Sequence, residues 1–70
     1  MARVKVYYDR LGNTLTVWFD DPQKEHVCEE TGDGIVLMKD DAGRVIGFEK
    51  LEFAAGDDRP LEVSFDAIGV

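Results

Sequence analysis

The chain has 70 residues, with 15 acidic against 8 basic side chains and a formal net charge of −7 at pH 7. Phosphate backbones repel such a surface and the few basic residues are scattered, so we expect no nucleic-acid partner. The single cysteine, Cys28, permits no intrachain disulfide, and with one histidine it gives too few ligands for structural zinc.

The first two predicted elements form a β-hairpin. Residues 3–8 and 14–20 both alternate apolar and polar side chains, the period of two that is typical of half-buried strands. Turn-forming residues 9–13 separate them. The alternation places Tyr7 and Trp18 together on the face opposite the aliphatic side chains.

Two strands are predicted in the middle of the chain. Residues 26–31 are polar and suit the edge of a sheet, where charge discourages further pairing. A glycine-rich turn at 32–34 follows. Residues 35–38 are apolar at every position, which predicts a central strand covered on both faces.

The last part of the chain changes phase. A turn at 39–44 precedes a return strand that begins at residue 45, but the apolar side chains switch faces before residue 53. A bulge or bend near Glu49–Lys50 is predicted to restore a single apolar face. The tail, residues 57–70, alternates only in part. The sequence allows either a further strand or irregular structure there.

These patterns predict one small domain over residues 1–70 that is mainly all-β. The expected fold is an antiparallel meander of five or six strands, curled or two-layered, with little or no helix. So small a chain without a disulfide or metal is expected to gain stability as a homodimer. No apolar stretch is long enough for a signal peptide or a membrane span, so we expect a cytoplasmic protein with no membrane contact.

The order of these segments resembles a known family. The chain is similar, over about residues 3–55, to the bacterial and archaeal DUF2283 family, and the similarity rests on Val-Lys-Val-Tyr-Tyr-Asp (4–9), Leu-Thr-Val-Trp-Phe (15–19), Glu-Glu-Thr-Gly-Asp-Gly-Ile-Val-Leu (29–37) and Asp-Ala-Gly-Arg-Val-Ile-Gly-Phe-Glu (41–49). The resemblance implies architecture and carries over no catalytic residues. It also implies a loose association with small toxin–antitoxin pairs. The tail departs from the family pattern, in which many members end in a short helix or stop.

Two clusters of polar residues are candidate chemical sites. Glu29, Glu30 and Asp33 are weak candidates for a hard cation, but their spacing does not match an EF-hand, and solvated turn residues explain them better. His26 and Cys28 share a face if the segment is extended. No orienting group adjoins them, so an edge histidine and a small partly buried cysteine explain them better than catalysis. We predict no catalytic residue, metal or cofactor.

Tyr7 and Trp18 are the candidate interface residues. Both amino acids are enriched at the energetic centres of protein interfaces. Three hypotheses compete for this pair. It is covered by another segment of the same chain, it is buried in a homodimer, or it is open to a different protein.

The expected function is a non-enzymatic protein-interaction module, an antitoxin-like partner of a small basic protein. The alternative is a small-ligand or metal-binding enzyme whose site forms between two subunits.

Overall fold

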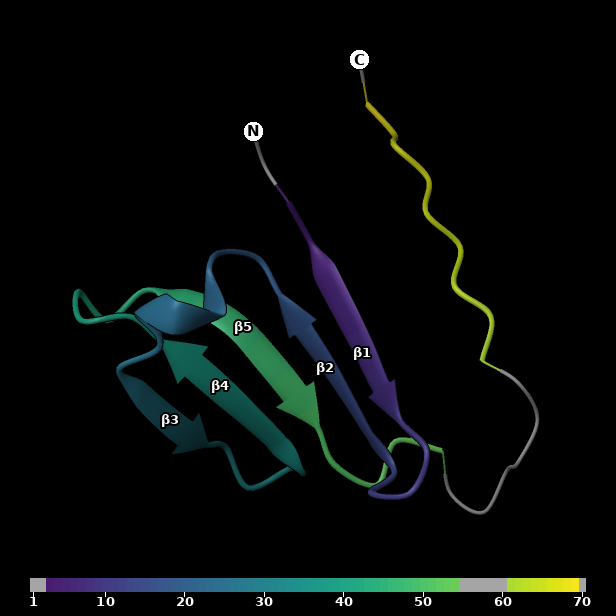
Figure 1. Ribbon diagram of the computed structural model, residues 1–70, viewed down its shortest axis with the longest axis horizontal. Helices are drawn as coiled ribbons and strands as arrows, with labels where there is room; N and C mark the ends of the chain where they lie inside the picture. The colour runs from purple at the N-terminus through teal and green to yellow at the C-terminus, as the bar shows by residue number, and fades with distance from the viewer. Residues whose placement is uncertain (1–2, 55–60, 70) are drawn as a thin grey trace.

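The computed structural model describes residues 3–54 and 61–69, and within these ranges the chain forms one open antiparallel sheet (Figure 1). The five strands are β1 (Lys5–Asp9), β2 (Thr14–Trp18), β3 (Val27–Glu30), β4 (Ile35–Lys39) and β5 (Val45–Lys50). The helical part of the described chain is one 3-10 turn, η1 (Pro22–Lys24), so the predicted all-β class is confirmed. None of the described segments is a helix that could cross a bilayer.

The strand order across the sheet is β1-β2-β5-β4-β3. Strands β3, β4 and β5 form a meander, and β5 then pairs with β2, so that the first hairpin joins the sheet through its second strand. The central strand is therefore β5, not the predicted strand at residues 35–38. A register shift between Met38 and Lys39 interrupts the β4–β5 ladder.

The β1–β2 hairpin follows its predicted alternation. Val6 lies opposite Val17 and Tyr7 opposite Thr16, so the aliphatic and the hydroxyl side chains occupy different faces. In the turn, the Asp9 carboxylate accepts the backbone N–H groups of residues 11 and 12, each at 3.0 Å. This local bonding lets the chain reverse within the five predicted turn residues.

Of the predicted bulge or bend, the structure has the bend, and it lies at Glu52, just beyond the end of β5 at Lys50. Glu52 has a positive φ of 50°, which turns the chain back toward the first hairpin. The backbone N–H of Phe53 then donates to the carbonyl of Asn13 at 3.0 Å. The ring of Phe53 meets Tyr8 edge-on, with centroids 5.7 Å apart.

The sheet has two different faces. The registers place one set of strand side chains on what we call the apolar face: Val6, Tyr8, Leu15, Val17, Val27, Glu29, Ile35, Leu37, Lys39, Ile46, Phe48 and Lys50. The other set forms the mixed face: Lys5, Tyr7, Asp9, Thr14, Thr16, Trp18, Cys28, Glu30, Val36, Met38, Gly47 and Glu49.

The sheet is a single layer, and its core is correspondingly thin. Among the described residues, the buried hydrophobic side chains are Met38 and Ile46, and no side chain is fully buried. The described part of the chain forms one open sheet, so the two-layered form of the prediction is not observed there. Ile35, Val36 and Leu37, expected to be covered on both faces, remain half-buried because no second layer lies over β4.

The tail forms no strand where it is described. Residues 61–69 are exposed and have no regular secondary structure (Figure 1). The predicted loop and tail residues 55–60 and residue 70 lie outside the described part of the chain.

Candidate functional site

The two candidate interface residues lie on the mixed face. Tyr7 is 54% exposed, although it occupies the middle of a strand. Its partner across the ladder is Thr16, so Trp18 is its diagonal neighbour, within reach for aromatic side chains. The structure therefore places both side chains on one face, as the alternation predicts.

Trp18 also has a structural role, which the sequence did not indicate. It pairs with Gly47, and a Cβ atom added to that glycine would lie 2.8 Å from Cε3 of the indole. The ring therefore lies over β5, in the space that a side chain would otherwise fill. This contact fixes the indole on the sheet and leaves Tyr7 as the freer member of the pair.

The mixed face is net acidic, since it carries Asp9, Glu30 and Glu49 against Lys5, which lies opposite Trp18. Glu49, on the central strand, accepts a hydrogen bond from the Thr16 hydroxyl at 3.1 Å. Asp9 and Glu30 belong to the same face, toward its two edges. The mixed face thus combines an exposed aromatic side chain with carboxylates, an arrangement that suits a ligand with cationic groups.

The candidate cation ligands do not meet. Glu29 lies on the apolar face and pairs with the Lys39 ammonium, whereas Glu30 lies on the mixed face. Asp33 belongs to the turn that follows β3. Over residues 3–54 and 61–69, no group of three or more histidine, cysteine or acidic side chains is placed to hold a metal ion.

The thiol of Cys28 is hydrogen-bonded to a carboxylate. The thiol donates to Glu25. This hydrogen bond stabilises the protonated thiol and raises the pKa of Cys28, with a further contribution from desolvation. A raised pKa disfavours the thiolate that nucleophilic catalysis needs.

We expect Cys28 to react slowly with iodoacetamide at pH 7.5. Replacing Glu25 by glutamine removes the carboxylate that raises the thiol pKa, so alkylation should become faster. The rate can be followed by mass spectrometry of the intact chain. Glu30→Gln is the control, since it makes the same charge change without touching the thiol. Equal rates in both variants would contradict the assigned hydrogen bond.

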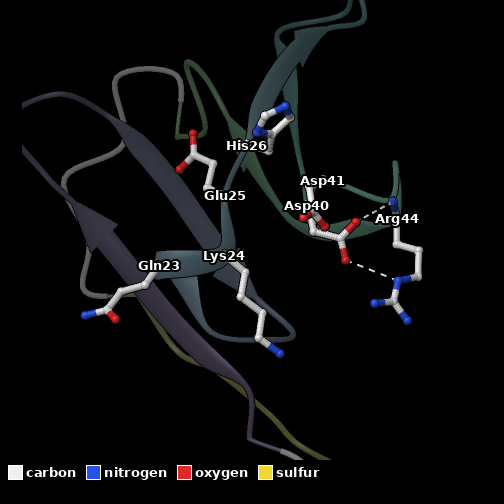
Figure 2. Close-up of a pocket in the computed structure, with 7 residues that line it drawn as sticks. All are labelled: Gln23, Lys24, Glu25, His26, Asp40, Asp41 and Arg44. Carbon is white, nitrogen blue, oxygen red and sulfur yellow. Dashed lines mark hydrogen bonds and ion pairs between the residues drawn. The ribbon is translucent and has the colours of Figure 1, made fainter.

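A shallow hollow of about 500 Å³ lies between η1 and the β4–β5 turn, and Figure 2 shows its lining. The labelled side chains diverge from one another, and none of the drawn interactions crosses the hollow. The interactions drawn join Asp40 to Arg44 within one turn. The hollow therefore offers no convergent set of polar groups of the kind that binds a small ligand.

A family model described as "Protein of unknown function (DUF2283)" matches residues 5–53 of the chain. The chain belongs to the DUF2283 family. No curated protein and no solved structure matches it. The DUF2283 match begins at the first residue of β1 and ends at Phe53, whose ring closes against Tyr8. It thus spans the whole sheet and excludes the tail.

Asp40, within the DUF2283 segment, closes the β4–β5 turn, and the sequence patterns did not predict this role. Asp40 is only 5% exposed, and its carboxylate accepts the backbone N–H groups of Ala42 and Arg44 at 3.0 and 2.9 Å. The guanidinium Nε of Arg44 adds a third bond at 3.1 Å. The available signal was an aspartate three residues before Gly43, a spacing typical of a side chain that closes a turn.

Proposed function

We propose that the chain is a non-enzymatic protein-interaction module, an antitoxin-like partner of a small basic protein. The observation that carries this proposal is the exposure of Tyr7 in the middle of a strand, diagonal to Trp18 on a face with more carboxylates than ammonium groups. An aromatic side chain in such a position is a typical anchor of a protein interface. We further propose that the module acts in the cytoplasm as a homodimer, where the exposed thiol of Cys28 stays reduced.

The charge of the molecule supports a basic partner. A net charge of −7 on 70 residues attracts cationic surfaces from a distance and raises the rate of encounter. On the mixed face, the carboxylates can then pair with lysine or arginine side chains, while the aromatic rings pack against their aliphatic or planar parts. Both effects favour a basic protein over a neutral or acidic one.

A capture experiment tests this function. The tagged chain, immobilised, is exposed to a lysate of the cells that encode it, and bound proteins are identified by mass spectrometry. We expect a small basic protein in near-stoichiometric amount, released by about 0.5 M salt because its charges are screened. Tyr7→Lys should reduce the captured amount about tenfold or more, since it removes the anchor and adds a repelling charge.

Leu11→Lys is the matched control. Leu11 is fully exposed in the β1–β2 turn, so this variant adds the same charge away from both faces. It should capture as much of the partner as the unmodified chain. Recovery of no basic protein, or equal capture by the two lysine variants, would contradict the proposed function.

A further inference from the structure

We propose that the apolar face is the surface on which a second copy of this chain packs, sheet against sheet. This inference rests on the proposed homodimer and names its interface. It assigns self-association to the face opposite Tyr7 and Trp18, which leaves the mixed face of each copy open to the basic partner.

The apolar face is incompletely covered. Nine of its twelve strand positions are aliphatic or aromatic, yet only Ile46 among them is buried. At one end, Phe19 packs against Phe48, with centroids 6.0 Å apart, and still remains 48% exposed. Stable domains bury such a face beneath a second layer of secondary structure, and the described chain supplies none.

The size of the face suits a dimer. Five strands spaced about 4.8 Å apart, with a mean length of five residues at about 3.3 Å per residue, give a projected face of about 400 Å². Two such faces contribute about 800 Å² in projection, and the relief of the side chains raises the accessible area further. The total is then of the same order as the roughly 1,000 Å² expected of a specific interface.

The distribution of charge favours a second copy over a basic protein on this face. The charged strand positions here are Glu29, Lys39 and Lys50, and the first two form an ion pair. The ammonium of Lys50 donates to the carbonyl of Leu51 at 2.8 Å, at the end of the sheet. This face carries one net positive charge, so the net negative charge of the molecule lies elsewhere. Two copies can meet here without repulsion between carboxylates, and a cationic partner finds no attraction.

A two-fold arrangement is consistent with this composition. In such an interface the same patch is used by both copies, so it must be complementary to itself. An aliphatic sheet with a polar rim satisfies this condition, because side chains from two sheets interdigitate at a separation of about 10 Å. Each interface position then occurs once in each copy, so a single substitution changes the interface at two places.

The test compares neighbouring residues of β1. Val6 and Tyr7 are 44% and 54% exposed, and they point to opposite faces of the same strand. Light scattering coupled to gel filtration should give twice the 7.8 kDa chain mass for the unmodified protein. Val6→Lys should raise the dimer dissociation constant about 100-fold or more, since it buries two unpaired charges. Tyr7→Lys makes the same charge change on the mixed face and should leave that constant within about threefold.

The outcomes of this experiment test the homodimer and the assigned surface separately. A single-chain mass for the unmodified protein up to millimolar concentration would overturn the homodimer itself, without bearing on capture of a basic partner. A dimer that survives Val6→Lys, or that only Tyr7→Lys dissociates, would overturn the assigned surface alone. If circular dichroism shows that Val6→Lys is unfolded, Val6→Thr replaces it. Threonine keeps the branched shape that a strand favours, and it should weaken the dimer about tenfold.

Discussion

Replacing Gly47 by alanine is expected to remove much of the stability of the protein. A Cβ atom at this position would lie 2.7 Å from the carbonyl oxygen of Val17 and 2.8 Å from Cε3 of Trp18. The first contact is with the backbone of the neighbouring strand and cannot be relieved by a side-chain rotation. We expect a loss of about 2 to 3 kcal/mol, as for other overpacked sites. This loss is large against the total of about 5 kcal/mol for a marginal domain.

Urea unfolding, followed by circular dichroism at a fixed protein concentration, measures this loss. Gly43→Ala is the matched control, since Gly43 has a positive φ of 81° but nothing within 4 Å of its added Cβ. It should cost about 1 kcal/mol from backbone strain alone. The Gly47→Ala change should also cost less when Trp18 is replaced by valine, because one of the two clashes is removed. Equal losses at both glycines would contradict the close approach at Gly47.

Local patterns predicted the faces of this sheet well. The alternation in residues 3–8 and 14–20 placed Tyr7 and Trp18 together, and the register confirms it. It could do so because side chains on a strand alternate strictly, so the sequence alone assigns each one to a face. The polar segment 26–31 was likewise correctly predicted as an edge strand, since charge without an apolar partner suits only an edge.

Local sequence patterns could not predict the order of the strands in the sheet. Residues 35–38 were expected at the centre because they are apolar throughout, but β5 is central. Gly47 gives no local indication of a central strand, because glycine is unfavourable in a strand interior. Its reason lies in a long-range contact, the indole of Trp18, which no local pattern shows. Residues 35–38 are apolar throughout because β4 presents aliphatic side chains to both faces of an open sheet, not because both faces are covered.

The candidate site was predicted only in part. The placement of Tyr7 and Trp18 on one face followed from alternation. The difference between them, one exposed and one lying over a glycine, did not. The link between Cys28 and Glu25 joins a strand to the segment before it, and it was missed because the pattern emphasised His26. Such contacts depend on how a loop enters a strand, and sequence spacing does not fix this geometry.

Asp40 is expected to make folding sensitive to acid. The backbone N–H of Arg44 donates to its carboxylate and lowers the pKa of Asp40, with help from Ala42 and from the Arg44 guanidinium, while desolvation opposes this shift. Because the folded pKa lies below the unfolded value of about 3.9, the unfolded chain binds the proton more tightly. The stabilisation by Asp40 is therefore complete above about pH 5 and is lost as the pH falls through the folded pKa.

Asp40→Ala should lower the melting temperature at pH 7 by about 5 to 10 °C, because the turn loses three hydrogen bonds. Asp40→Asn keeps an oxygen acceptor for the two backbone donors and should lower it by less. Between pH 5 and pH 2, the melting temperature of Asp40→Asn should also fall less steeply than that of the unmodified protein. Some slope should remain, since the backbone N–H of Asp21 lowers the pKa of Asp20 as well.

Asp41→Asn provides the control for this pH dependence. Asp41 is the exposed neighbour of Asp40 and makes the same change in formal charge when replaced. Its variant should follow the unmodified protein across the whole pH range, at equal protein concentration. If Asp40→Asn and Asp41→Asn changed the slope equally, the cause would be net charge and not the closed turn. A difference confined to Asp40 would identify this carboxylate as the group that holds the β4–β5 turn, and with it the central strand, in place.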